Sequence, residues 1–165
     1  MNVDSGLEML SPEECISLAA TMPIGRIVFT DRALPAVQPV NFLIEDGSVI
    51  IRTTQGSKLA TATRNAIVAF EIDEFDRRSQ AGWSVTMIGR AQSVHDPAES
   101  ARLARLPLHT WASGPQDRFI RIRPEQISGR RLPASARCTG HHPQHPANGH
   151  LNGATRQQSN GATGH

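Results

Sequence analysis

Residues 37–58 read VQPVNFLIEDGSVIIRTTQGSK, and this stretch decides the expected fold. Two segments rich in β-branched and apolar residues, 36–45 and 48–54, flank the dipeptide Asp46-Gly47. Asp-Gly between two such segments is typical of a tight β-hairpin turn, so we expect an antiparallel hairpin here. Pro39 lies inside the first strand and has no N–H to donate, which indicates that the strand is irregular or lies at an edge at that point.

A set of polar and cationic side chains follows at the end of the second strand: Arg52, Thr53, Ser57 and Lys58. A guanidinium fork, an ammonium group and two hydroxyls are suitable donors for a phosphate dianion. A short helix that begins near Ser57 would add backbone N–H groups at its positive end. Because the stretch lacks the spacing of a P-loop, a solvated surface turn is the alternative to a phosphate site.

The rest of the chain reads as short strands and two further helices. Two helices are expected to begin with a capping residue, a proline and a glutamate in the positions typical of a helix start. These are Ser11-Pro12-Glu13-Glu14 and Asp96-Pro97-Ala98-Glu99. Besides the hairpin, we expect strands at residues 26–30, 66–73, 82–95 and 118–123, with a loop at 74–80 and Pro124 ending the last strand. Gly89, inside its strand, indicates a bulge or a close backbone approach.

Six strands with short connections predict a mainly β protein. Most gaps between the strands are too short for crossover helices, so we expect a six-stranded antiparallel β-barrel with a few flanking helices. We expect a flexible N-terminus at residues 1–9, one domain at residues 10–132, and a disordered His/Gly/Asn-rich tail at residues 133–165.

Composition excludes several classes of function. The formal net charge of +2 gives no electrostatic case for nucleic-acid binding. No apolar run approaches the roughly 18 residues of a membrane span and no signal peptide is present, so we expect a cytoplasmic protein. Cys15 and Cys138 share no metal-ligand spacing, and the tail histidines lack preorganisation, so no metal site is expected. His95 and His109 are isolated, and we expect them to be structural.

The order and the amino-acid sequences of these segments resemble those of the flavin-binding split barrels of the pyridoxamine 5′-phosphate oxidase-like family, in particular its short actinobacterial members. The resemblance covers residues 10–131 and rests on the order of five elements, with no single motif decisive. They include the stretches VQPVN at 37–41, RTTQGSK at 52–58, GWSV at 82–85 and GRR at 129–131. It implies a split β-barrel and a homodimer that binds flavin mononucleotide (FMN) at the subunit interface.

The resemblance also implies which residues bind the cofactor. The flavin ring would accept and donate hydrogen bonds along the backbone of one strand, and the Asn41 side chain would add one more. The residues of this strand segment are Val37, Gln38, Pro39, Val40 and Asn41. The phosphate would lie on the polar residues at 52–58 described above. Trp83 and Ser84 would border the ring from the same or the partner subunit, while Arg130 and Arg131 either reach the ring or the substrate or form a basic end to the domain.

We therefore expect an FMN-binding oxidoreductase that transfers hydride or electrons between a nicotinamide or oxygen and a small organic substrate. The sequence contains no nucleophile–base–acid motif, which fits a protein whose cofactor supplies the chemistry, and no catalytic residue is assigned. The Arg-Leu-His element of the true vitamin B6 oxidases is absent, so oxidation of pyridoxamine phosphate is not expected. The alternatives are a deazaflavin F420-dependent reductase of the same fold and a non-catalytic flavin carrier or sensor.

Overall fold

The computed structural model describes residues 7–54, 57–108 and 117–134. Residues 135–165 with Cys138 and the tail histidines, and also His109, lie outside these ranges. The described elements follow one another as β1 (Glu8–Leu10), α1 (Pro12–Ala19), β2 (Ile24–Asp31), β3 (Leu34–Glu45), β4 (Ser48–Thr54), α2 (Lys58–Ala62), β5 (Ile67–Asp76), β6 (Ala81–Ser93), α3 (Pro97–Leu103) and β7 (Asp117–Leu132).

The strands form one antiparallel sheet in the order β1-β7-β4-β3-β2-β5-β6, and a further pairing of β6 with β7 closes it. Six strands therefore form a closed ring, as expected, and the short strand β1 is a seventh that pairs with the end of β7. The sequence did not indicate β1, because three residues are too few to show an alternating pattern.

The ring is split between β3 and β4. These two strands share only the register from Phe42↔Ile51 to Glu45↔Ser48. Beyond this point β3 continues along β2 as far as Asp31↔Leu34, while β4 continues along β7 as far as Thr54↔Asp117. The expected split barrel is confirmed, and Pro39 lies in the part of β3 that has left β4, where a missing N–H costs no ladder hydrogen bond.

The last strand does not end at Pro124, contrary to the sequence expectation. β7 continues through it to Leu132 and pairs with β6 along almost its whole length. The register shifts by one residue at Ile88/Gly89, where Gly89 faces Pro124, so Glu125 is the extra residue of a bulge. A side chain on Gly89 would overlap the Arg123 carbonyl oxygen. The bulge and the close approach expected at Gly89 are thus both present, and they let the strand accept proline.

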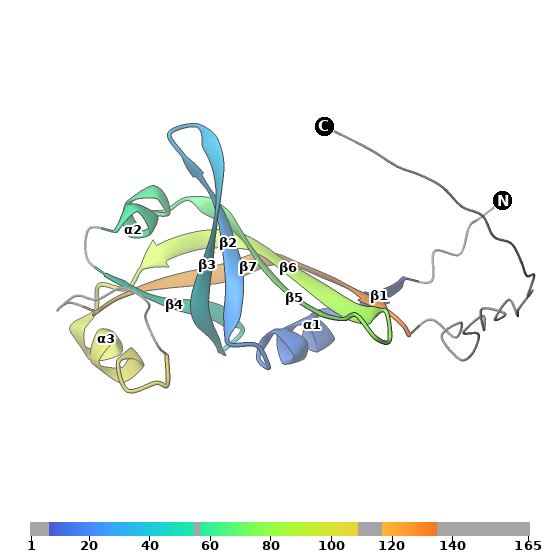
Figure 1. Ribbon diagram of the computed structural model, residues 1–165. Helices are drawn as coiled ribbons and strands as arrows, with labels where there is room; N and C mark the ends of the chain where they lie inside the picture. Colours follow the sequence, from blue (N-terminus) through green and yellow to red (C-terminus); the bar gives the residue numbers. More distant parts are fainter. Residues whose placement is uncertain (1–6, 55–56, 109–116, 135–165) are drawn as a thin grey trace, which may run out of the picture.

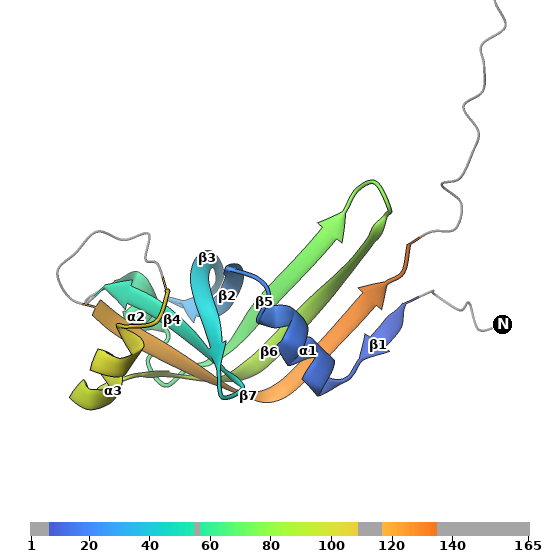
Figure 2. The same cartoon turned by 90° about the horizontal axis from the view of Figure 1, so that it is seen from below.

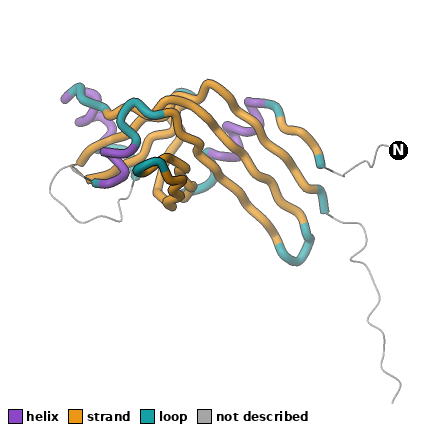
Figure 3. The backbone as a smooth tube through the Cα atoms, turned by 90° about the horizontal axis from the view of Figure 1, so that it is seen from above, coloured by secondary structure: helices purple, strands orange, loops and turns teal. Residues whose placement is uncertain are grey.

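The hairpin of β5 and β6 extends beyond the barrel together with β7 and β1, which Figures 1 and 2 show as a long projecting sheet. We call residues 73–84 and 128–132, with β1, the arm; Figure 3 shows the same arm from the other side. The loop expected at residues 74–80 is shorter than predicted, because 74–76 pair with 81–83 and extend the hairpin. Helix α1 packs against β7 and β6, where Cys15 fills the space beside Gly129.

Two apolar clusters hold these parts together. The larger fills the barrel and includes Ile27, Phe70 and Met87, all fully buried. The smaller lies outside the ring between α3 and the strands β4 and β7, and includes Leu103 and Phe119.

The predicted local signals are present at the helix starts and the hairpin turn. Ser11 and Glu14 form the capping box of α1, and Asp46 and Gly47 both have positive φ, as the tight turn requires. Asp96 caps α3, but the Glu99 carboxylate pairs with Arg121 instead of closing a capping box.

Candidate functional site

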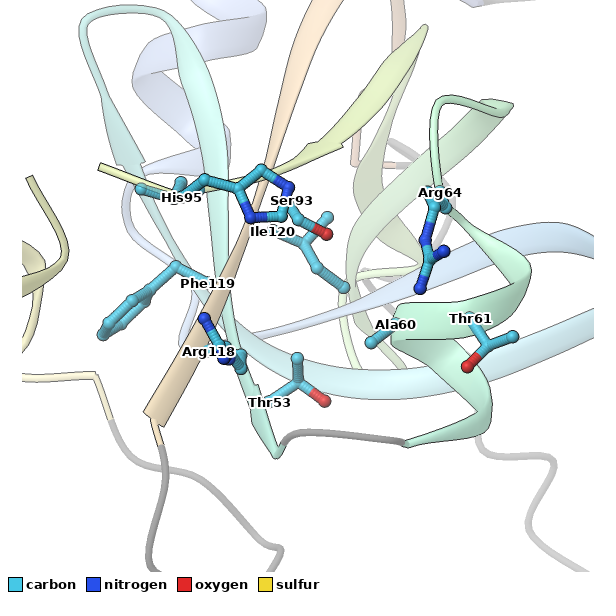
Figure 4. Close-up of a pocket in the computed structure, with 10 residues that line it drawn as sticks. Thr53, Ala60, Thr61, Arg64, Ser93, His95, Arg118, Phe119 and Ile120 are labelled. Atoms are coloured by element: carbon cyan, nitrogen blue, oxygen red, sulfur yellow. The ribbon is translucent and has the colours of Figure 1, made fainter. Parts of the chain in front are cut away.

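A cavity of about 190 Å³ lies at one end of the barrel, where α2 faces the ends of β4, β6 and β7 (Figure 4). It is lined by Thr53, Ala60, Thr61, Arg64, Ser93, Val94, His95, Arg118, Phe119 and Ile120. Strand register brings the walls together, because Thr53 pairs with Arg118 and Ser93 pairs with Ile120. Three segments far apart in the sequence, residues 53–64, 93–95 and 118–120, therefore meet at this point.

The polar groups of the cavity are hydroxyls and cations. Thr53, Thr61 and Ser93 contribute hydroxyls, while Arg64 lies across from His95 and Arg118 (Figure 4). None of the described residues that line the cavity carries a carboxylate. The Arg64 and Arg118 guanidinium groups contribute positive charge to this lining, and the hydroxyls add donors. This set of donors fits a phosphate group.

Of the four residues in the predicted phosphate motif, Thr53 lines this cavity and Ser57 contacts Thr53 from outside the lining. The Ser57 and Thr53 hydroxyls are 2.9 Å apart, and the Ser57 hydroxyl also accepts the Ala60 N–H at 3.1 Å. Ser57 therefore caps α2 as expected and ties the helix to β4. Because α2 has only five residues and this N–H is already bound, the expected contribution of a helix dipole is small.

The two cations of the motif lie elsewhere. Arg52 is on the opposite face of β4 from Thr53, since neighbouring strand residues alternate. Its guanidinium donates to the Leu108 carbonyl at 3.0 Å and lies 6.0 Å from the centre of the Phe119 ring. Lys58 begins α2 with an exposed side chain outside the cavity lining.

Sequence reasoning missed the cations that do line the cavity, Arg64 and Arg118, and assigned His95 a structural role. Arg64 had a signal that could have been used: it lies three residues after Thr61 just past α2, at helical spacing. Arg118 and His95 had none, because they reach the same cavity only through the pairing of β7 with both β4 and β6.

The split in the barrel leaves one edge of β3 open at residues 37–41. Phe42 directs its N–H toward the β2 side, to the Pro23 carbonyl at 3.3 Å. Backbone groups alternate along an antiparallel strand, so Gln38 and Val40 also point to β2, while Val37 and Pro39 point to the opposite edge. No strand of the described chain pairs with that edge of Val37 and Pro39. A ligand at the split would therefore meet the backbone of Val37 and Pro39, two of the five residues that the resemblance implies for the ring.

Trp83 and Ser84 lie on the arm, far from the cavity of the same chain. Trp83 and Ser93 lie ten positions apart on β6, which is roughly 30 Å along a strand. The Trp83 indole N–H donates to Glu74 at 3.2 Å. The register places Trp83 opposite Arg131 and Ser84 opposite Arg130, so these four residues do gather on one part of the arm. Arg131 is tied to Glu8 at 3.3 Å and to Glu14 at 3.8 Å.

Neither a metal site nor a membrane span is found within residues 7–54, 57–108 and 117–134. No three potential metal ligands among these residues cluster together. No helix in this part of the chain has the length and apolar character needed to cross a membrane.

The fold and the cavity define a split barrel with a cationic cavity at one end, and comparison with known proteins gives the family. The family model described as pyridoxamine 5′-phosphate oxidase matches residues 11–131. The chain belongs to this family.

Three relatives illustrate the range of similarity. The uncharacterized protein Rv0080 of Mycobacterium tuberculosis is 42% identical over 133 residues, which cover 78% of this chain and 87% of the relative. The FAD binding protein of Mycobacterium smegmatis is 37% identical with a TM-score of 0.65, covering 76% of this chain and 97% of that one. A conserved protein of unknown function from Corynebacterium diphtheriae is 27% identical with a TM-score of 0.65, covering 77% and 98%.

Proposed function

We propose that this protein binds a flavin and that the phosphate of the flavin occupies the cavity under α2. The observation that carries the proposal is the convergence of Arg64, Arg118 and three hydroxyls on one cavity whose described lining has no carboxylate. Independent support comes from the relative at 37% identity that is named an FAD binding protein.

The flavin ring would lie along the open edge of β3. An isoalloxazine ring carries hydrogen-bond donors and acceptors along one side, and the outward-facing backbone groups of Val37 and Pro39 would complement them. Asn41 is the next residue whose backbone points to that edge of β3, and its amide side chain would offer a further hydrogen bond. The same chain would thus bind the phosphate at the barrel end and the ring at the split.

We further propose that the site is completed in a homodimer. Within one chain Trp83 and Ser84 are too far along β6 to reach a ligand in the cavity region. The arm that carries them projects away from the barrel, and it has exposed apolar side chains at Met9 and Phe75. A second copy would cover these side chains and bring its Trp83 toward the flavin.

The proposed cofactor is FMN, and the proposed activity is that of an oxidoreductase. When bound, the flavin would supply hydride or electron transfer between a nicotinamide or oxygen and a small organic substrate. The cavity residues would bind the phosphate, the open edge of β3 would align the ring, and the arm would limit the access of water. A flavin carrier without turnover is the second candidate, because none of the described residues at the cavity forms a nucleophile–base pair.

The first test is cofactor retention. The protein would be dialysed separately with FMN, FAD and F420, and its visible absorption spectrum recorded. We expect FMN to be retained. Retention of FAD or F420 instead would change the cofactor but keep the site, and retention of none of the three would overturn the proposal.

The second test locates the phosphate. We expect Arg64→Gln to weaken FMN binding by about 1.5–3 kcal/mol, since a hydrogen bond to a charged group is lost. Lys58→Ala is the matched comparison. The sequence motif places the phosphate at Lys58, whereas Lys58 does not line the cavity. A larger loss of affinity in Lys58→Ala than in Arg64→Gln would move the phosphate out of the cavity.

The third test separates the enzyme from the carrier. The FMN-loaded protein would be mixed with NADPH without oxygen, and bleaching of the flavin absorption followed. We expect reduction that is faster than that of free FMN, and re-oxidation by an added quinone or nitro compound. Tight binding without stimulated reduction would favour the carrier.

A further inference from the structure

We propose that His95 is a third cationic ligand of the cavity under α2, and that its protonation makes binding of a phosphate monoester depend on pH. The inference rests on the proposed function, because it concerns the same cavity. It gives a specific role to a residue that the sequence indicated only as structural.

The backbone holds His95 at the cavity from both sides. The preceding residue, Val94, is buried and donates its N–H to the Phe119 carbonyl at 2.9 Å, which fixes the end of β6 on β7. The following residue, Asp96, caps α3 by accepting the Glu99 N–H at 3.0 Å. His95 lies between these two anchored residues, and Figure 4 shows its imidazole on the same side as Ser93.

The charged groups around His95 come from three elements. Arg64 follows α2 and Arg118 lies on β7, and both line the cavity with His95. Asp96 is the acid next to it in sequence, and its carboxylate is used by the α3 cap. From β4 and β6 the lining residues are neutral hydroxyls, Thr53 and Ser93. A phosphate bound in this cavity would lie among the Arg64 and Arg118 guanidinium groups and the His95 imidazole.

This arrangement predicts the direction of the pH effect. Histidine is the side chain that changes charge between about pH 5 and pH 8. A bound phosphate dianion stabilises the imidazolium, and by linkage protonation of His95 strengthens phosphate binding. Affinity contributed by His95 is therefore present at low pH and is lost as the pH rises.

The test compares variants at each pH, because the ligand phosphate also titrates near pH 6 and would otherwise obscure the result. The dissociation constant of FMN would be measured for the full chain and for His95→Gln at about pH 6 and about pH 8.5. We expect His95→Gln to weaken FMN binding about tenfold at the lower pH and less than about twofold at the higher pH. An equal effect at both values would overturn the proposal.

Two controls make the outcome specific to phosphate and charge. Riboflavin, which lacks the phosphate, should bind the protein and His95→Gln with the same affinity at both pH values. His95→Lys keeps a positive charge, so it should bind FMN tightly at both, without the loss at the higher pH. A pH-dependent difference between the protein and His95→Gln with riboflavin, or weak FMN binding by His95→Lys at both pH values, would count against His95 as a phosphate ligand.

A final measurement separates this inference from the proposed function. Inorganic phosphate should raise the unfolding temperature of the protein more than that of His95→Gln at about pH 6, because a ligand that binds only the folded state stabilises it. If FMN fails to bind but this difference is seen, the proposed function is wrong and the role of His95 stands. If FMN binds, but neither FMN nor inorganic phosphate distinguishes the protein from His95→Gln at about pH 6, only the role of His95 is wrong.

Discussion

Gly89 shows how one residue determines the path of the longest strand. It faces Pro124 across the β6–β7 ladder, and the Arg123 carbonyl occupies the space where a side chain would begin. The bulge at Glu125 then shifts the alternation of β7, so Ile120 and Ile122 face the barrel interior before it and Gly129 faces α1 after it. The closure of the barrel and the course of the arm both depend on this contact.

We expect Gly89→Ala to destabilise the protein by about 1–3 kcal/mol, because backbone rather than a flexible side chain must move to admit the methyl group. Chemical denaturation followed by tryptophan fluorescence would measure the change. Gly47→Asn is the matched control, since asparagine tolerates positive φ and the nearest atom to a new Cβ there is 4.0 Å away. Equal effects of the two substitutions would mean that the close approach at Gly89 is unimportant.

At the scale of elements, an ion network holds α3 on the barrel. Glu45 accepts hydrogen bonds from Arg102 of α3 at 2.5 and 2.9 Å and from Arg121 of β7 at 3.1 Å. Arg121 also pairs with Glu99 at 2.5 Å. This network lies beside the smaller apolar cluster, whose residue Phe119 also lines the cavity. The position of α3 therefore contributes to one wall of the proposed site.

The network predicts how stability depends on pH. The hydrogen bonds from Arg102 hold the pKa of the Glu45 carboxyl below its usual value. A lowered pKa in the folded state means that Glu45 contributes stability above the pKa of the unfolded chain, and that this contribution is lost as the pH falls through the folded value. The network should therefore weaken in acid.

We expect Glu45→Gln to lower the free energy of unfolding by about 1.5–3 kcal/mol near neutral pH, because hydrogen bonds to a charged group are lost. The difference from the unmodified protein should shrink as the pH falls below the ordinary range of a glutamate. Urea denaturation at several pH values would measure it. Glu125→Gln, at an exposed residue without an ion pair among the described residues, should show little difference at any pH. A constant deficit of Glu45→Gln across the pH range would contradict the electrostatic explanation.

At the scale of the whole molecule, the barrel end and the arm carry different parts of the proposed site. Arg64 and Trp83 lie in regions that one chain cannot bring together. In a two-fold symmetric dimer the same contact occurs twice, so each site would combine the cavity of one subunit with the arm of the other.

This arrangement predicts complementation between two defective variants. Arg64→Gln and Trp83→Ala should each bind FMN poorly, yet a mixed dimer of the two contains one site with both original residues. After co-refolding of equal amounts, we expect FMN to be retained tightly at about a quarter of all sites. Light scattering should give twice the mass of one chain. Recovery of no tight sites from a confirmed mixed dimer would mean that both residues act within one subunit or that they do not share a site.

Several features could be predicted from the sequence because their causes are local. The capping box at Ser11 and Glu14, the hairpin turn at Asp46-Gly47, and the cap at Ser57 depend on a few neighbouring residues, and the structure shows each of them. The mainly antiparallel fold followed from short connections between the strands. The order of the segments was also enough to indicate the family.

Other features depend on which strands lie side by side, and only the tertiary structure decided them. Pro124 would end an ordinary strand, but Gly89 of another strand gives it room. Arg52 seemed to belong with Thr53, but alternation turns it to the opposite face of the sheet. The cavity is formed by residues from α2, β4, β6 and β7 whose sequence spacing carries no pattern. The sequence by itself determined the elements and their turns, because those depend on contacts between neighbouring residues. The cationic cavity was decided by the register of distant strands, which no local pattern contains.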